Sequence, residues 1–357
     1  MKSIVGCVAC FAALLFAGCA AAPKQAVYVS TSGDGQVVVY DLDNASGRLT
    51  LKQRVDVGKK VGPITLSSDR RFAYAAVRGE RAVAALAVDD DGTLTLLDKT
   101  GIDTNAAYIS LDRTEQWMLT ADYGGGKVGV YRLGDNHQVK PQPIQVVTTD
   151  RNAHAIYTDV SNRFAFVPHT GPSAIYQFQF DDQAGRLTPN DPPVVIAPNR
   201  AGPRHYHYHP VLNVVYFINE LDSTITAYHF DSQRGTLAEF QNVSTLPADF
   251  TAKNTCAQIH MTPDGRFLYG SNRGHDSIAA FAVDPATGEL SPIGRFATEK
   301  RPRGFSLDAT GRWLFAAGQD TGRLAVYRID PQTGTLTRTA TYDVGPDPTW
   351  VQLMTLP

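Results

Sequence analysis

The stretch QVVVYDLD (Gln36–Asp43) is a short apolar segment that ends in an acidic turn residue, and six similar segments follow it along the chain. They read RAVAALAVD, KVGVYRLG, SAIYQFQFD, STITAYHFD, DSIAAFAVD and GRLAVYRID. Equivalent apolar positions in the seven copies are 46, 45, 47, 50, 53 and 46 residues apart: Val37, Val83, Val128, Ile175, Ile225, Ile278 and Leu324. A period in the mid-forties, built from short strands and turns, is typical of a β-propeller with one four-stranded blade per repeat. Seven copies therefore predict seven blades.

Each repeat can be divided into four strands, called a to d from the centre of the ring outwards. No stretch shows a sustained helical period, so the fold class is all-β. The first repeat lacks a strand a, because its first apolar stretch, AVYVST at 26–31, matches a strand b. The C-terminal stretch TWVQLM (Thr349–Met354) has the alternation needed to supply the missing strand. We predict a seven-bladed β-propeller over residues 26–357, closed by the C-terminal strand that completes the first blade.

Residues 1–18 are predicted to be a signal peptide of the lipoprotein type. Lys2 precedes an apolar run of 14 residues, Ile4–Ala17, which is too short to span a bilayer comfortably but suits a signal-peptide core. Gly18-Cys19 resembles the bacterial lipobox, so residues 19–25 are interpreted as the lipidated Cys19 and a short tether. A plain secretory signal cleaved after the AAA at 20–22 is the alternative. The first interpretation places the protein in the cell envelope, facing the periplasm or the exterior, with membrane contact through the lipid anchor only.

Charge and cysteine content restrict the expected partners. The chain has 33 Lys and Arg against 35 Asp and Glu, a net charge of −2, and contains no basic blocks. Nucleic acid is therefore not expected as a partner. Outside residues 1–19 the only cysteine is Cys256, which we interpret as a small buried apolar residue because a lone thiol cannot cross-link its own domain. A monomer without a cofactor is expected.

One face of the predicted disc is expected to carry the function. Strands within a blade are antiparallel, so the b–c and d–a loops emerge together on one side, and function usually sits in variable loops on a rigid scaffold. Two long d–a loops are expected there, at 189–202 and 245–258. The same connections hold most of the uncommon polar residues: His154, His169, Arg204, His205, Glu220, Arg273, His275, Arg303 and Gln319.

Within AGPRHYHYHP (Ala201–Pro210), three histidines alternate directly behind an arginine. In an extended strand, His205, His207 and His209 would share one face, about 6.5–7 Å apart. A three-histidine metal ladder is disfavoured, because compact metal sites usually draw ligands from several elements. We expect His205 to line the mouth of the central channel, and His207 and His209 to point down the same face, either as channel lining or as hydrogen-bonded core. No metal is assigned, although a metal near His154, His169 and His205 stays open.

Four stretches resemble the motifs of the seven-bladed lactonase family, which includes bacterial 6-phosphogluconolactonase and fungal carboxy-cis,cis-muconate cyclase. They are AGPRHYHYHP, VVYFINELDSTITAY, SNRGHDSIAAFAVDPATGEL and PRGFSLDATGRWLFAAGQ. The resemblance covers essentially all of the chain after the signal segment. It implies a small-molecule lactone as the substrate. At the position of His169 the family more often has an aspartate.

The resemblance also implies the site residues. The residues proposed for catalysis in the muconate cyclase correspond to His154, Arg204, Glu220 and Arg273. Arginines suit a carboxylate or a developing oxyanion. Glutamate or histidine can relay a proton, so Glu220 is assigned as base and His154 as proton donor or orienter. The substrate-binding residues would be His205, His169, Asn272, His275, Arg303 and Gln319.

Two alternatives accompany this assignment. Arg204 and Glu220 could form only a structural ion pair, and the chain could be a non-catalytic exported propeller that binds a ligand or a protein on the same face. If the protein is an exported enzyme, an unphosphorylated sugar lactone or another acyl lactone is favoured as substrate, because sugar phosphate lactones are cytoplasmic.

Overall fold

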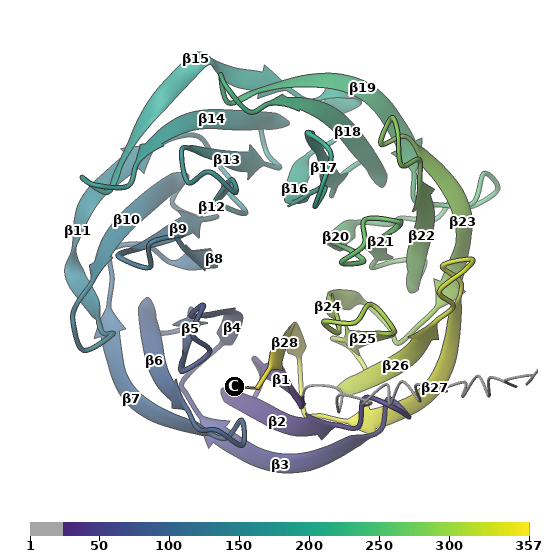
Figure 1. The fold of residues 1–357 in the computed structure, drawn as a ribbon, viewed down its shortest axis with the longest axis horizontal. Coiled ribbons are helices and arrows are strands. Elements are labelled where there is room, and N and C mark those ends of the chain that lie inside the picture. The colour runs from purple at the N-terminus through teal and green to yellow at the C-terminus, as the bar shows by residue number, and fades with distance from the viewer. Residues whose placement is uncertain (1–23, 357) are drawn as a thin grey trace, which may run out of the picture.

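The computed structural model describes residues 24–356, and within them seven four-stranded antiparallel sheets form a closed ring (Figure 1). The first blade has the order β28-β1-β2-β3, and the other six each use four consecutive strands. In the described part of the chain the only helical element is the short 3-10 turn η1 (Pro198–Arg200). The seven-bladed all-β prediction is confirmed.

Within each blade the strands run from a at the channel to d at the rim. Blades one to three hold β28 (Pro348–Thr355), β1 (Gln25–Thr31), β2 (Gln36–Leu42) and β3 (Leu49–Asp56); β4 (Val61–Leu66), β5 (Phe72–Val77), β6 (Ala82–Val88) and β7 (Leu94–Gly101); β8 (Ala106–Leu111), β9 (Trp117–Asp122), β10 (Lys127–Leu133) and β11 (Val139–Thr148). Blades four and five hold β12 (Tyr157–Thr158), β13 (Phe164–His169), β14 (Ala174–Asp181) and β15 (Arg186–Ile196); β16 (Pro203–Tyr208), β17 (Val214–Asn219), β18 (Thr224–Asp231) and β19 (Thr236–Ser244). Blades six and seven hold β20 (Cys256–Met261), β21 (Phe267–Asn272), β22 (Ser277–Val283) and β23 (Leu290–Ala297); β24 (Pro302–Leu307), β25 (Trp313–Gly318), β26 (Arg323–Ile329) and β27 (Leu336–Asp343).

The core lies between neighbouring blades, which explains why the repeated segment is apolar at nearly every position. Successive side chains of a strand point to opposite faces of its sheet. In β2, Val37 and Val39 pack against the second blade, whereas Val38 and Tyr40 pack against the seventh. Each sheet is therefore covered on both faces, and no blade can bury its faces without its neighbours.

The ring is closed by β28, as the sequence predicted. This strand pairs antiparallel with β1 along its whole length, from Gln25 opposite Thr355 to Thr31 opposite Pro348. Met354 joins the core shared with the second blade, and Leu353 joins the core shared with the seventh. The C-terminal strand thus completes two blade interfaces as well as one sheet.

A bulge recurs near the start of strand a. In six blades the pairing of strand a with strand b shifts by one residue there. In the fourth blade an isolated bridge joins Ala153 to His169 in place of the regular ladder, and His154 follows it. We call the residue at this point the bulge residue, and the seven are Gly62, Ala107, His154, Arg204, Ala257, Arg303 and Thr349. Bulges re-aim side chains and are common beside functional sites.

The first long d–a loop is shorter than the sequence suggested. The chain from residue 189 to 196 belongs to β15, and Phe178 pairs with Pro189 while Tyr176 pairs with Val194. The expectation of a loop was wrong because Pro192 and Pro193 lie in this bulge, where the ladder requires no N–H donors. The second long loop lies between β19 and β20.

The predicted signal peptide and Cys19 lie outside the described residues. Among residues 24–356, no helix has the length and apolar character needed to cross a membrane.

Candidate active site

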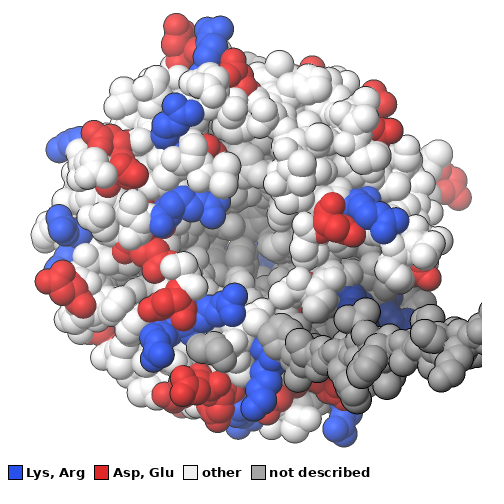
Figure 2. Space-filling model, viewed as in Figure 1, with Lys and Arg blue, Asp and Glu red and all other residues white. Residues whose placement is uncertain are grey.

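A cavity of about 1180 Å³ lies at the central channel, on the face formed by the b–c and d–a loops. Figure 2 shows the face on which the C-terminus lies (Figure 1); it is hollowed at the centre of the disc, and acidic and basic residues are interspersed over it. The bulge residues His154, Arg204 and Arg303 line the cavity together with loops of the first two blades. The recurring bulge therefore places polar side chains from separate blades around one space.

The most buried charges at the site form a cluster of two arginines and one glutamate. Arg204 Nε lies 3.1 Å from Glu220 Oε2, and Arg273 Nη2 lies 2.9 Å from Glu220 Oε1. The Arg204 side chain is only 2% exposed, and its Nη1 also donates to the carbonyl of Ala257. Burial raises the pKa of Glu220, but Arg204 and Arg273 more than offset it, so this pKa is below its usual value. Glu220 is thus ionised and bridges the two guanidinium groups.

Two histidines continue this cluster. Arg204 Nη1 lies 3.3 Å from His205 Nε2, which lies 3.2 Å from His154 Nδ1. Burial, reinforced by the positive charge of Arg204, lowers the pKa of both imidazoles well below the usual value. Both rings are therefore neutral at pH 7. The edge of the His154 ring also meets Tyr123, with ring centroids 5.3 Å apart.

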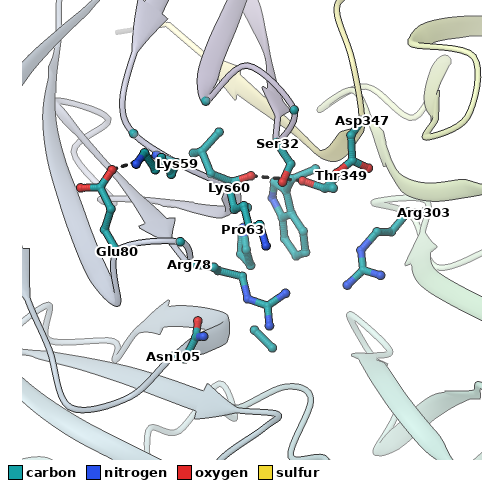
Figure 3. Close-up of a pocket in the computed structure, with 18 of the residues that line it drawn as sticks. Ser32, Lys59, Lys60, Pro63, Arg78, Glu80, Asn105, Arg303, Asp347 and Thr349 are labelled. Carbon is teal, nitrogen blue, oxygen red and sulfur yellow. Dashed lines mark hydrogen bonds between the residues drawn. The ribbon is translucent and has the colours of Figure 1, made fainter.

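Two further arginines of the cavity make no direct contact with an acid among the described residues, although Asp122 acts on Arg78, and Glu220 and Asp347 act on Arg303, at longer range. Neither Arg78 nor Arg303 forms an ion pair or a side-chain hydrogen bond with any residue in 24–356, and Arg78 Nε is buried and unsatisfied. Figure 3 shows both guanidinium groups pointing into the same open space. Burial lowers the pKa of both side chains, that of Arg303 to about 10 with the help of the positive charges of Arg273 and Arg78. A buried, unpaired cation is costly, so this space suits an anionic group of a ligand.

Most of the residues predicted from the sequence converge on this site. His154, Arg204, His205, Arg303 and Gln319 line the cavity, and Glu220 and Arg273 lie directly behind Arg204. The Gln319 amide donates to Asp347 Oδ1 over 2.7 Å.

Three residues that were expected to bind substrate lie elsewhere. His169 is fully buried and hydrogen-bonds Val167 and Thr149. Asn272 is also fully buried, and its side chain forms hydrogen bonds with Thr245, which follows the last strand of the preceding blade. His275 contacts Ser277 and the ring of Phe250. Their side chains are engaged in joining loops, and none of the three lines the cavity.

The three alternating histidines have three different surroundings. His205 reaches the cavity, and His207 lies beside the ring of His260, 6.0 Å between centroids. His209 lies at the a–b turn, where its Nδ1 accepts from the backbone N–H groups of Val211 and Leu212. Among residues 24–356, no three His, Cys, Asp or Glu side chains are grouped so that they could hold a metal ion.

Sequence reasoning missed Arg78, Tyr123 and Gln258. The first two directly follow a strand b, as Glu220, Arg273 and Gln319 do in their blades. Aligning the seven repeats at the end of strand b would have found them. Gln258 follows the bulge residue Ala257 as His205 follows Arg204, and the same alignment would have placed it at the site.

Fold and site together define a β-propeller with a cavity at its centre that is lined by polar and charged side chains. The sequence profile described as "Lactonase, 7-bladed beta-propeller" matches residues 26–353. Two relatives named 6-phosphogluconolactonase are each 35% identical to the chain. That of Yersinia pestis aligns over 330 residues, 92% of this chain and 98% of the relative, and that of Xenorhabdus nematophila over 333 residues, 93% and 100%. The chain belongs to the seven-bladed β-propeller lactonase family.

Solved structures show the same fold. The periplasmic gluconolactonase of Pseudomonas aeruginosa superposes with a TM-score of 0.87 at 24% identity and covers 94% of this chain and 100% of that one. A protein from Lactobacillus plantarum gives 0.84 at 25% identity, covering 93% and 100%. These likenesses extend over the whole ring.

Proposed function

We propose that this protein hydrolyses a lactone of a sugar or a related acid in the central cavity. The observation that carries the proposal is the meeting, in one cavity, of two unpaired arginines with a neutral histidine beside a fixed arginine–glutamate cluster. Neutral imidazole can accept a proton at pH 7, and guanidinium groups can stabilise a developing oxyanion. The family to which the chain belongs supports this reaction class.

In the proposed reaction, the oxygen of a water attacks the lactone carbonyl carbon while His154 takes one of the water's protons. The carbonyl oxygen becomes an oxyanion, which the positive charge of Arg204 stabilises. Collapse of this intermediate breaks the bond between the carbonyl carbon and the ring oxygen. The imidazolium then returns its proton to the leaving alkoxide, and a hydroxy acid results.

This scheme changes the role first assigned to Glu220. Its carboxylate is occupied by two arginines, its pKa is lowered, and it does not line the cavity. We assign it the task of holding Arg204 and Arg273 in place. His154, which lines the cavity and is neutral, is the better placed base.

The unpaired arginines bear on the substrate class. Arg78 and Arg303 favour a lactone that carries a second, negatively charged group. A lactone with a carboxylate satisfies both this preference and the expectation that an exported enzyme acts on an unphosphorylated substrate.

Replacing Arg303 by methionine should raise KM for an anionic lactone by about 10- to 100-fold, because hydrogen bonds to charged groups contribute about 1.5–3 kcal/mol. KM for glucono-δ-lactone, which is neutral, should change little. Arg323→Met is the matched control, since that arginine is half exposed and pairs with Asp343 away from the cavity. Rates would be measured on glucono-δ-lactone, glucaro-1,4-lactone and 6-phosphogluconolactone. Equal effects on all three substrates would contradict the anion preference.

A non-catalytic role of the same face is the second candidate. It would be favoured if the wild-type protein opened none of the lactones in this panel yet bound an unrelated ligand in a manner that Arg303→Met weakens.

We also propose that the protein is exported and lipid-anchored through Cys19, on the strength of the lipobox-like Gly18-Cys19 and the apolar run before it. Cys19→Ser should abolish incorporation of a palmitate analogue and leave unprocessed or slowly processed precursor in the cell. Metabolic labelling followed by fractionation is the measurement. Recovery of unlabelled wild-type protein that begins after Ala22 would favour the plain secretory signal instead.

A further inference from the structure

A chain of hydrogen-bonding side chains leads from the cavity into the central channel. His154 Nδ1 lies 3.2 Å from His205 Nε2, and His205 Nδ1 contacts Oε1 of Gln258. Gln258 Nε2 in turn lies 2.8 Å from Nε2 of His260. His205 and Gln258 are 4% and 5% exposed, so water does not compete freely for these contacts. This series of hydrogen bonds therefore couples His154 to His260, which lies outside the cavity lining.

Arg204 on one side of His205 and Gln258 on the other together set the direction of the bonds in this chain. A guanidinium can only donate, so His205 Nε2, 3.3 Å from Arg204 Nη1, is the acceptor nitrogen of its ring. The proton of the neutral His205 ring is then on Nδ1 and is donated to Gln258 Oε1. His154 Nδ1 also faces the acceptor nitrogen of His205 and must carry its own proton. The Nε2 atom of His154 is left with a free lone pair.

The far end of the chain has the same direction. With its oxygen turned to His205, Gln258 presents its amide N–H groups to His260, whose Nε2 must accept. Burial first, and then His207, lowers the pKa of His260 to about 3, so this ring is neutral and has one proton. Because Nε2 accepts from Gln258, that proton is on Nδ1. Both ends of the chain thus require one orientation of the Gln258 amide.

We infer that Gln258, held between His205 and His260, is a positioning residue that fixes His154 in the tautomer with a free Nε2. The inference rests on the proposed function only for its consequence, which is that the free Nε2 receives the proton of the attacking water. The other groups that face His154 are Arg204, Arg303 and Tyr123. Arg204 and Arg303 can only donate, and the hydrogen bond between the His154 ring and its own backbone also favours a protonated ring nitrogen.

The tautomer can be measured without any substrate. In the full chain labelled with 15N-histidine, long-range 1H–15N correlation spectra distinguish protonated from unprotonated ring nitrogens, and His154→Asn identifies the relevant signals among the nine histidines. We expect the Nδ1–H form for both His154 and His205 in the wild type. Gln258→Leu removes the acceptor for His205 and should shift His154 wholly or partly to the Nε2–H form. A wild-type His154 in the Nε2–H form would overturn the inference.

Two companion variants separate positioning from loss of structure. Gln258→Glu keeps an oxygen acceptor for His205 and should retain the wild-type tautomer of His154. His207→Gln alters the neighbour of His260 but leaves the chain intact, because His207 donates to the carbonyl of Tyr208 instead, and should change neither the tautomer nor the rate. A shift of the His154 tautomer in His207→Gln as large as in Gln258→Leu would contradict the assigned chain.

The kinetic consequence is a fall in kcat. Gln258→Leu should lower kcat on the lactone panel by about 10- to 100-fold, the range typical of a residue that acts through another, with little change in KM. If His154 of the wild type is in the Nδ1–H form but the protein opens no lactone of the panel, the proposed function is refuted and the inference stands. Lactone opening that survives Gln258→Leu with an unchanged His154 tautomer would refute the inference alone.

Discussion

Deleting residues 349–357 should abolish the native ring. Val351, Leu353, Met354 and Leu356 are at most 9% exposed and belong to the two cores that flank the first blade. Burying each such side chain contributes about 1.5–3 kcal/mol, so the four together contribute about 6–12 kcal/mol. Domains are typically stable by only about 5–15 kcal/mol. The deletion also exposes the whole inner edge of β1.

Thermal unfolding followed by circular dichroism would test this expectation. The truncated protein should show no cooperative transition, or one at a much lower temperature than the full chain. A peptide of residues 348–357 added in excess should restore the transition, because it supplies the missing strand without a covalent link. Closure by β28 would be disproved by a truncated protein that melts with the full chain.

Glu220→Gln should have the second largest effect, on activity and stability together. It leaves Arg204, whose side chain is 2% exposed, without its carboxylate partner. Removing one partner of a buried ion pair costs about 3–5 kcal/mol, because the remaining charge is buried and uncompensated. Turnover should fall by about 10²–10³-fold, as for loss of a group that stabilises the oxyanion, since both arginines lose their orientation.

The matched control is Asp343→Asn. It breaks the Arg323–Asp343 pair, which is similar in distance at 3.1 Å but has exposed side chains, so Tm should be nearly unchanged. The double variant Glu220→Gln/Arg204→Met removes both charges of one pair and should recover part of the stability lost by Glu220→Gln, while activity stays low. An unchanged melting temperature for Glu220→Gln would show that the cluster is not effectively buried.

The ring was predictable because its signal is repeated. Seven copies of one strand, and the pairing of an unmatched start with TWVQLM, determine the number of blades and the closure. The proline-rich segment at 189–196 was misread as a loop, because sequence alone does not reveal that a bulge can hold two prolines inside a strand.

The site was predictable only where a loop residue differs in kind from its neighbours. Arg204 and Glu220 stand out in this way, and the structure brings them together. His169 and Asn272 stand out equally, yet they are used for hydrogen bonds between loops. Gln258 attracts no attention in the sequence, because its importance depends on its contact with His205, which lies on a strand of the neighbouring blade.

The bulge in strand a also bears on how such a ring can diversify. The bulge residue has no partner across the ladder, so exchanging a small bulge residue leaves the ladder hydrogen bonds of the sheet intact. Gly62 and Ala107 are small bulge residues that line the cavity, so a larger side chain at either position would extend toward it. New specificities can therefore arise one blade at a time, by single substitutions whose effects on folding are small. The residues that can change the chemistry of the site are thus largely separate from the residues that stabilise the ring.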